Sequence, residues 1–170
     1  MIVRRAEPVD AARVAAIYAH YVATSAATFD ESAPGNEEIA DKIASITSAA
    51  LPFVVAEMHG RVGGYGYLSP YGGRSAYRYT VESSVYVAPD ARGRGVGRAL
   101  LERLLAEAEQ AGVREVIAII AVTDDPASVA LHRGCGFGEA GRLKAVGFKH
   151  GRWYDTLLMQ RSLAPRAQAD

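Results

Sequence analysis

The amino-acid sequence predicts an α/β (α+β) domain built on a mixed, twisted sheet of seven strands, with about four helices on its faces. The chain has 170 residues, a length that fits one domain better than two. Hydrophobic residues make up 49% and charged residues 22% of the chain, which is ordinary for a soluble globular protein. Helical and strand periodicities follow one another in the order βααβββαβαββ, which packs most economically as a sheet with helices on both faces. We expect the domain to span 1–163 and a flexible tail to follow at 164–170.

The first half of the chain is expected to hold two helices and four strands. A β-like segment at Met1–Arg5 precedes Pro8, which suits the first turn of a helix. Apolar residues at helical spacing predict helices at Val9–Ala23 and Glu37–Ala50, with a loop at Thr24–Gly35 between them. Three further strands are expected at Phe53–Glu57, Val62–Leu68 and Tyr77–Val87. A Pro/Gly loop at Ser69–Ser75 would join the last two of them.

The second half is expected to alternate helices with strands. After a glycine-rich turn at 92–97, an apolar stripe predicts a helix that Gly112 ends. The segment Val113–Val122 is apolar and β-branched, which predicts a central strand covered on both faces. A short helix at Asp125–Arg133 would begin with Asp125 as its N-cap and Pro126 in its first position. The last elements are expected to be strands at Phe137–Val146 and Trp153–Gln160, with a loop at Gly147–Gly151.

The charge balance and the cysteine content narrow the class of protein. Lys+Arg and Asp+Glu both number 19, and a net charge of zero argues against binding to nucleic acid or to a membrane surface. The single cysteine, Cys135, excludes an internal disulfide and a multi-cysteine metal site. The first residues do not form a signal peptide, and no apolar run approaches the length of a membrane span. We therefore expect a cytoplasmic protein with no metal.

The glycine-rich turn Arg92-Gly93-Arg94-Gly95-Val96-Gly97 lies between a predicted strand and an amphipathic helix. Glycines let the backbone approach a ligand closely, and the first N–H groups of the helix favour an anion. Arg92, Arg94 and Arg98 add positive charge, which suits a pyrophosphate. A Walker-type loop is excluded because no Gly-Lys-Ser/Thr follows, and the arginine at position 98 breaks the dinucleotide pattern G-x-G-x-x-G. Taken alone, the turn is equally compatible with a loop that merely begins a helix.

The same turn fits the Q/R-x-x-G-x-G/A signature of the GNAT superfamily of N-acetyltransferases, and the order of elements matches that superfamily. Three further blocks resemble its phosphinothricin and methionine sulfoximine/sulfone branch, namely Tyr79–Val87, Ser128–His132 and Gly147–Asp155. The resemblance extends from about Ile2 to Leu163. It implies a GNAT-like, mostly antiparallel sheet, acetyl-CoA as the co-substrate, a small-molecule amine as the acceptor and a homodimer.

The resemblance also implies where acetyl-CoA binds. The pantetheine arm would pair with the strand after Glu82, and the pyrophosphate would lie on the glycine turn. Asp125 stands where the family has an asparagine, and an ionised carboxylate accepts a hydrogen bond but cannot donate one. A backbone N–H near Val85 is expected to stabilise the thioester oxygen. The predicted cofactor-binding residues are Val85, Tyr86, Val87, Arg92, Gly93, Arg94, Gly95, Val96, Gly97, Arg98, Asp125 and Ser128.

Glu82 is the predicted general base. Acetyl transfer needs a neutral amine, so a group must take a proton from the substrate ammonium, directly or through water. Strand alternation places Glu82 on one face with Ser84 and Tyr86, among apolar neighbours that would raise its pKa by desolvation. The pattern alone favours a solvent-facing glutamate or one paired with Arg78. The resemblance favours the base, because this branch uses that glutamate.

His132 is predicted to protonate the leaving thiolate, as an acid or as a relay. Many members of the superfamily use a tyrosine for this step, whereas the phosphinothricin branch has a histidine at this position, as this chain does. Histidine titrates near neutral pH, which suits either role. A helix histidine satisfied by its neighbours is the alternative.

The acceptor pocket is expected in the loops that flank the Glu82 strand. Arg74 would bind a carboxylate or phosphinate through its bidentate guanidinium, although an exposed loop arginine is an equal alternative. The predicted substrate-binding residues are Phe29, Glu31, Tyr71, Arg74, Tyr77 and Tyr79.

The function predicted from these residues is direct acetyl transfer to the α-amine of phosphinothricin, methionine sulfoximine or methionine sulfone, which would confer herbicide or antibiotic resistance. One alternative is another amine acceptor, such as a protein N-terminus, a polyamine or an aminoglycoside. The other alternative is a CoA-binding regulator without turnover.

Overall fold

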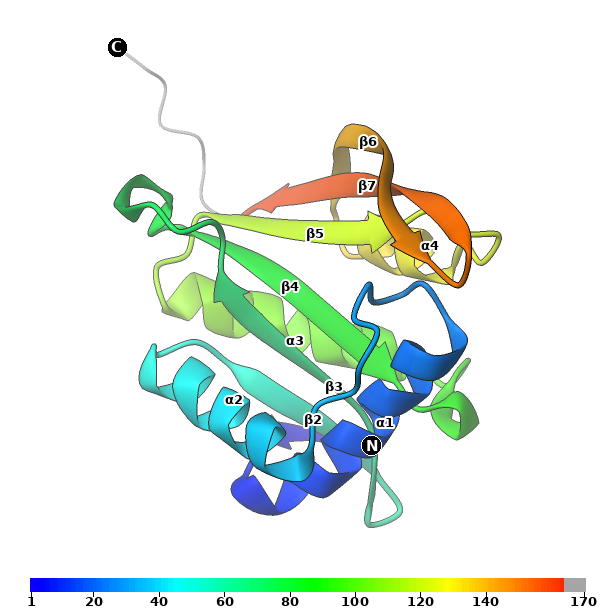
Figure 1. Cartoon of the computed structure of the whole chain (residues 1–170). Coiled ribbons are helices and arrows are strands. Elements are labelled where there is room, and N and C mark those ends of the chain that lie inside the picture. Colours follow the sequence, from blue (N-terminus) through cyan, green and yellow to red (C-terminus); the bar gives the residue numbers. More distant parts are fainter. Residues whose placement is uncertain (164–170) are drawn as a thin grey trace.

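Seven strands form one sheet in the computed structural model of the protein, which describes residues 1–163 (Figure 1). The strands are β1 (Ile2–Arg5), β2 (Phe53–Met58), β3 (Arg61–Pro70), β4 (Thr80–Val87), β5 (Glu115–Ala121), β6 (Gly138–Lys149) and β7 (Arg152–Ser162). Their order across the sheet is β1-β2-β3-β4-β5-β7-β6. The β4·β5 pair is parallel and the other neighbouring pairs are antiparallel. The predicted mixed, mostly antiparallel fold class is therefore confirmed.

Helices cover both faces of this sheet (Figure 1). They are α1 (Ala11–Thr24), α2 (Asn36–Ser48), α3 (Val96–Gln110) and α4 (Ala127–Gly134), with short 3-10 turns at Pro8–Asp10, Ser75–Tyr77 and Pro89–Ala91. The first two lie on one face, and α3 and α4 lie on the other (Figure 1). None of these helices within residues 1–163 has the length and apolarity needed to cross a membrane.

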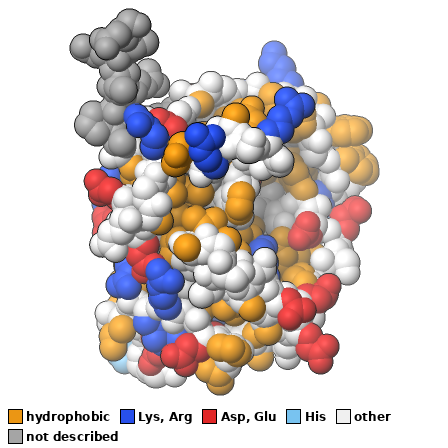
Figure 2. Space-filling model, turned by 90° about the vertical axis from the view of Figure 1, so that its left-hand side faces the viewer, with side chains coloured by type: hydrophobic (Ala, Val, Ile, Leu, Met, Phe, Trp, Pro, Cys, Tyr) orange, Lys and Arg blue, Asp and Glu red, His pale blue; other side chains and the backbone are white. Residues whose placement is uncertain are grey.

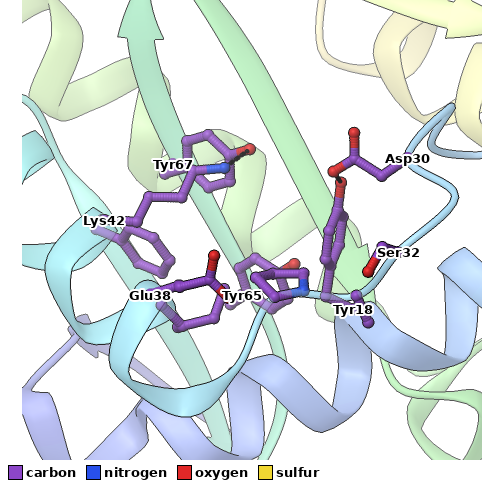
Figure 3. Close-up of a pocket in the computed structure, with 11 residues that line it drawn as sticks. Tyr18, Asp30, Ser32, Glu38, Lys42, Tyr65 and Tyr67 are labelled. Atoms are coloured by element: carbon purple, nitrogen blue, oxygen red, sulfur yellow. Dashed lines mark hydrogen bonds between the residues drawn. The ribbon is translucent and has the colours of Figure 1, made fainter.

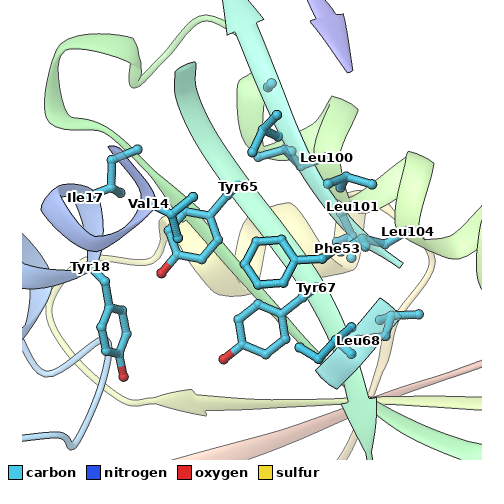
Figure 4. Close-up of a cluster of buried hydrophobic side chains, with 14 of the residues drawn as sticks. Val14, Ile17, Tyr18, Phe53, Tyr65, Tyr67, Leu68, Leu100, Leu101 and Leu104 are labelled. Atoms are coloured by element: carbon cyan, nitrogen blue, oxygen red, sulfur yellow. The ribbon is translucent and has the colours of Figure 1, made fainter. Parts of the chain in front are cut away.

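The strand β3 shows why the two faces pack differently. Its tyrosines face α1 and α2, where Tyr65 and Tyr67 stack on Phe53 with ring centroids 5.8 and 5.2 Å away (Figure 4). Two of its glycines, Gly64 and Gly66, face α3, and a Cβ atom on Gly64 would lie only 2.8 Å from a methyl carbon of Val96. Strand alternation thus puts large rings on one side and these two glycines on the other, so that α3 packs directly against the backbone there.

Several predicted boundaries were wrong, each for a local reason. The first helix begins at Ala11 rather than Val9, because Pro8–Asp10 forms a 3-10 turn. The strand β4 begins at Thr80 rather than Tyr77, because another 3-10 turn precedes it. The predicted loop at Gly147–Gly151 shrinks to its last two residues, since Gly147, Phe148 and Lys149 pair with β7.

Two further expectations concern β5 and the tail. The prediction that β5 is covered on both faces was wrong, because Ile119 is 44% exposed and lines an open cleft. A continuous apolar run does not reveal where a neighbouring strand diverges and uncovers one face. The tail expected at 164–170 lies outside the described residues.

The partly buried ion pair between Arg4 and Asp10 ties β1 to the start of α1. Asp10 is 5% exposed, and its two carboxylate oxygens accept hydrogen bonds from Arg4 at 2.7 and 2.9 Å. The same carboxylate accepts the N–H of Glu7 at 2.9 Å. The Arg4 hydrogen bonds lower the pKa of Asp10.

We therefore expect Asp10→Asn to reduce the free energy of unfolding by about 1–3 kcal/mol at pH 7, because one partner of a charge-assisted bond is lost. A lowered carboxyl pKa stabilises the fold above the pKa of the unfolded chain, about 3.9, and this contribution is lost as the pH falls further. The difference in the free energy of unfolding between wild type and variant should accordingly become smaller below about pH 4. Urea unfolding at several pH values measures this, and a loss no larger than that of the exposed Asp41→Asn would contradict it.

Candidate active site

The strands β4 and β5 run side by side at their beginnings and then diverge (Figure 1). Their parallel pairing covers only Thr80–Glu82 against Glu115–Ile117. The N–H of Ala88, just after β4, donates to the carbonyl of Gly63 on β3. Along an antiparallel pair of strands, every second residue uses its N–H and C=O to bond to the partner strand. The even-numbered residues of β4 therefore bond to β3. The backbone groups of Val85 and Val87 therefore point to the opposite edge, where β5 has moved away.

A cleft of about 980 Å³ occupies this opening. It runs between the end of β4, the first turn of α3, the strand β5 and the helix α4, and it reaches the loop after α1. Viewed from the left-hand side of Figure 1, the surface is hollowed, with hydrophobic side chains beside the hollow and acidic side chains to its right (Figure 2). The cleft brings together residues from segments far apart in the sequence.

The glycine turn forms one end of the cleft. Gly93 and Gly95 have φ values of 71° and 78°, the left-handed region that glycine adopts without strain. Open space surrounds the position of a Cβ atom on either residue. All the predicted residues of the turn line the cleft except Arg94. This end therefore presents a bare backbone and the N–H groups that open α3, an arrangement that fits an anionic diphosphate.

Arg92 is held in place by Tyr21. Its guanidinium donates to the hydroxyl of Tyr21 at 3.2 Å, and that hydroxyl donates to the carbonyl of Val87 at 2.6 Å. Across the cleft, the Asp125 carboxylate accepts the N–H of Ala127 at 2.9 Å, as a capping side chain does. The predicted start of the helix was one residue too early, because α4 begins at Ala127 and Pro126 takes the N-cap position. Asp125 and Ser128 both line the cleft.

Glu82 is half-buried in the cleft where β4 and β5 begin to diverge. Burial raises the pKa of its carboxyl group, and the charge of Lys42 partly opposes this rise. Within residues 1–163 the carboxylate makes no hydrogen bond or salt bridge. The alternative pairing with Arg78 does not form, because Arg78 donates to the carbonyl of Ser75 and lies over the ring of Tyr79.

His132 also lines the cleft, where it is 5% exposed. Its Nδ1 lies 2.8 Å from the carbonyl oxygen of Ser128, which can only accept, so Nδ1 carries the proton of the neutral ring. Burial lowers the pKa of the imidazole. Its Nε2 has no hydrogen-bond partner among the described residues, and neither does the buried hydroxyl of Thr156, which lines the same cleft. A neutral ring with an available Nε2 suits proton transfer.

Of the predicted substrate residues, only Phe29 lines the cleft. Its ring occupies the place that a side chain at position 147 would need, so the glycine there seats the loop after α1 against β6. The remaining five residues line neither this cleft nor a smaller cavity beside it that Phe53 and Tyr65 help to form. They are Glu31, Tyr71, Arg74, Tyr77 and Tyr79. Their role in this chain stays a prediction.

Sequence reasoning missed a group of polar side chains beside Glu82. Tyr18, Asp30, Lys42 and Tyr67 all line the cleft, and they come from α1, the following loop, α2 and β3. The one available signal was that Lys42 directly precedes Ile43 on the buried stripe of α2, which does not reveal what it faces. In residues 1–163 no three His, Cys, Asp or Glu side chains gather where they could hold a metal ion.

Comparisons with known proteins agree with this geometry. Residues 14–137 match the model of the Acetyltransferase (GNAT) family. The chain is 50% identical to a phosphinothricin N-acetyltransferase of Alcaligenes faecalis, over 91% of this chain and 78% of that protein. It is 35% identical to an L-methionine sulfoximine/L-methionine sulfone acetyltransferase of Salmonella typhimurium, over 100% and 99% of the two chains.

A solved structure gives the same result for the fold. The phosphinothricin acetyltransferase of Sinorhizobium meliloti, in complex with acetyl-CoA, superimposes with a TM-score of 0.90 at 43% identity. The alignment covers 95% of this chain and 87% of that one. The cleft between the diverging strands, the glycine turn at α3 and these matches lead to one conclusion: the chain belongs to the acetyltransferase (GNAT) family and is an N-acetyltransferase.

Proposed function

We propose that this enzyme transfers the acetyl group of acetyl-CoA to the α-amine of a small amino-acid analogue of the phosphinothricin, methionine sulfoximine or methionine sulfone type. The observation that supports this most is the Glu82 carboxylate, half-buried and without a hydrogen bond, in one cleft with the available Nε2 of His132. The relatives named above act on these analogues. One domain, residues 1–163, carries the activity.

In this proposal the cleft holds acetyl-CoA along the free edge of β4. Val85, Tyr86 and Val87 bind the pantetheine arm, and the odd-numbered residues offer backbone groups that β5 does not use. The turn from Arg92 to Arg98 holds the pyrophosphate through backbone N–H groups and positive charge. No metal takes part. Acetyl-CoA supplies the activated acyl group, and the chain supplies position and proton transfer.

Glu82 takes the proton of the substrate ammonium, directly or through water, and a raised pKa makes it a better base. The N–H of Val85 stabilises the charge that develops on the thioester oxygen. His132 serves the leaving thiolate as a relay rather than as a standing acid, because its lowered pKa keeps the imidazole neutral near pH 7. Its unprotonated Nε2 first accepts a proton that the attacking amine releases and then donates that proton to the sulfur as the C–S bond breaks.

We also propose that the enzyme is a cytoplasmic homodimer whose activity confers resistance to such analogues. Support for the dimer comes from the β6–β7 hairpin, where large hydrophobic side chains are exposed. Phe148 and Trp153 are 52% and 63% exposed, and Leu143 and Val146 are 48% and 52% exposed. Exposed apolar side chains concentrated on one element often mark a contact with another protein.

Thiol release from acetyl-CoA tests the proposed activity. Calorimetry first establishes that the purified protein binds acetyl-CoA. Turnover is then measured on phosphinothricin, methionine sulfoximine and methionine sulfone, with glutamate and methionine as controls, and we expect release with at least one analogue above both controls. Release only with polyamines, aminoglycosides or peptides would identify a different acceptor, and binding without release on any amine would indicate a regulator.

A further inference from the structure

A second cavity of about 370 Å³ adjoins the cleft on the α1 and α2 side of the sheet (Figure 3). The two cavities share four lining residues, Tyr18, Asp30, Lys42 and Tyr67. Phe53 and Tyr65 form part of its wall. Because the walls are shared, the side cavity lies directly beside the part of the cleft that these four residues line.

The carboxylates of the side cavity already have hydrogen-bond donors from the chain. Asp30 accepts the hydroxyl of Tyr18 at 2.5 Å, and Figure 3 shows these two side chains pointing toward each other. Glu38 accepts the backbone N–H of Gly35 at 2.7 Å, which closes the first turn of α2.

Lys42 is the one basic side chain among the described residues that line the side cavity, and its ammonium is not paired with a carboxylate. Its ammonium donates to the hydroxyl of Tyr67 at 2.7 Å, which is a neutral partner, and Figure 3 shows the lysine reaching that hydroxyl from α2. Within residues 1–163 it forms no salt bridge. An ammonium has three N–H donors, so donors remain for a ligand after the bond to Tyr67 is made. A half-buried cation of this kind favours an anionic group in the cavity.

The sheet places this cation close to the predicted base. Tyr67 on β3 pairs with Ser84 on β4, and Glu82 lies two residues before Ser84 on the same face. Diagonal neighbours of this kind are about 7–8 Å apart, within reach of long side chains. The charge of Lys42 also opposes the rise in the pKa of Glu82, which agrees with their proximity.

We infer that the side cavity is an acceptor subsite in which Lys42 binds an anionic group, a carboxylate or a phosphinate, of the amine that Glu82 deprotonates. Tyr67 orients the ammonium. This inference rests on the proposed function, and it assigns to Lys42 the anion-binding role that the sequence predicted for Arg74. That arginine lines neither cavity. Another basic residue that lines the cleft, Arg152 on β7, has its guanidinium over the ring of Tyr154.

Two pairs of acceptors test the subsite and identify the anionic group. The first pair is methionine sulfone and its α-carboxamide, which lacks the carboxylate and so carries no anion. The second pair is phosphinothricin and its α-carboxamide, which lacks the carboxylate but keeps the phosphinate. Lys42→Met should raise the KM of every acceptor that keeps the recognised anion by about 10-fold to 100-fold, since a charge-assisted hydrogen bond is lost. The KM of acetyl-CoA and that of the carboxamide lacking the anion should not change. Lys42→Arg should retain most of the affinity, and Asp41→Asn, on the adjacent exposed residue of α2, is the matched control.

Calorimetric titration of the CoA-loaded protein with the same acceptors separates this inference from the proposed function. A wild type that binds the anionic acceptor more tightly than its neutral counterpart, in a Lys42-dependent way, supports the subsite even if no acetyl transfer follows. Acetyl transfer with equal KM values for wild type and Lys42→Met would overturn the subsite and leave the function standing. An equal loss on anionic and neutral acceptors would also overturn it, because Lys42 would then act through Glu82 alone. The subsite would likewise be overturned if the wild type bound the anionic acceptor no more tightly than the neutral one.

Discussion

Replacing Glu82 with glutamine is expected to lower turnover by about 100-fold to 10,000-fold, the range that a positioned general base contributes. Glutamine keeps the shape of the side chain but cannot accept the substrate proton. The KM of acetyl-CoA should change little, because the turn at 92–97 and the edge of β4 remain intact. Steady-state kinetics on the best acceptor measure both quantities.

The pH profile makes this prediction sharper. Glu82 acts as a base only when ionised, so the turnover of the wild type should fall as the pH drops through its pKa, which burial raises above the usual glutamate value. The residual turnover of Glu82→Gln should not show this fall at low pH. Near-wild-type turnover across the pH range would remove Glu82 as the base.

Stability provides an independent control on the same variant. A raised carboxyl pKa means that ionisation of Glu82 opposes folding once the pH exceeds the pKa of the unfolded chain. Glutamine carries no charge to bury, so Glu82→Gln should unfold at the same or a higher temperature than the wild type at pH 7. Lower stability together with low turnover would point to damage of the fold rather than to loss of a base.

Replacing His132 should reduce turnover by about 100-fold or more while leaving the affinity for acetyl-CoA nearly unchanged. The imidazole contributes an available Nε2 in the cleft, and only this atom could serve the leaving thiolate, since Nδ1 donates to Ser128. His132→Ala removes the ring, and His132→Asn keeps a donor for the Ser128 carbonyl. Calorimetry with acetyl-CoA and steady-state kinetics on both variants separate binding from turnover.

The opposite pattern would assign His132 to binding. If both variants weaken acetyl-CoA binding and turn over normally at saturation, the histidine positions the cofactor. Because the side chain is buried, thermal unfolding of each variant must accompany the kinetics. The asparagine variant keeps the test informative if alanine destabilises the fold.

The cofactor side of the cleft could be predicted from the sequence because its signals are local. The glycine turn is six consecutive residues that lead into a helix, and tight turns and helix N-termini follow from neighbouring residues alone. Strand alternation likewise placed Glu82 with Ser84 and Tyr86 without knowledge of the partner strands. The resemblance then gave these local features a chemical meaning.

The acceptor side depended on tertiary structure. Lys42 and Tyr67 are 25 positions apart along the chain and meet only because α2 packs on the face of the sheet to which the β3 tyrosines point. The exposure of Ile119 follows from the divergence of two strands, and the long β6–β7 hairpin from pairing that a glycine at position 147 does not interrupt. Local periodicity specifies which face a residue takes. The neighbour opposite that face is set by long-range packing, which single-chain patterns do not encode.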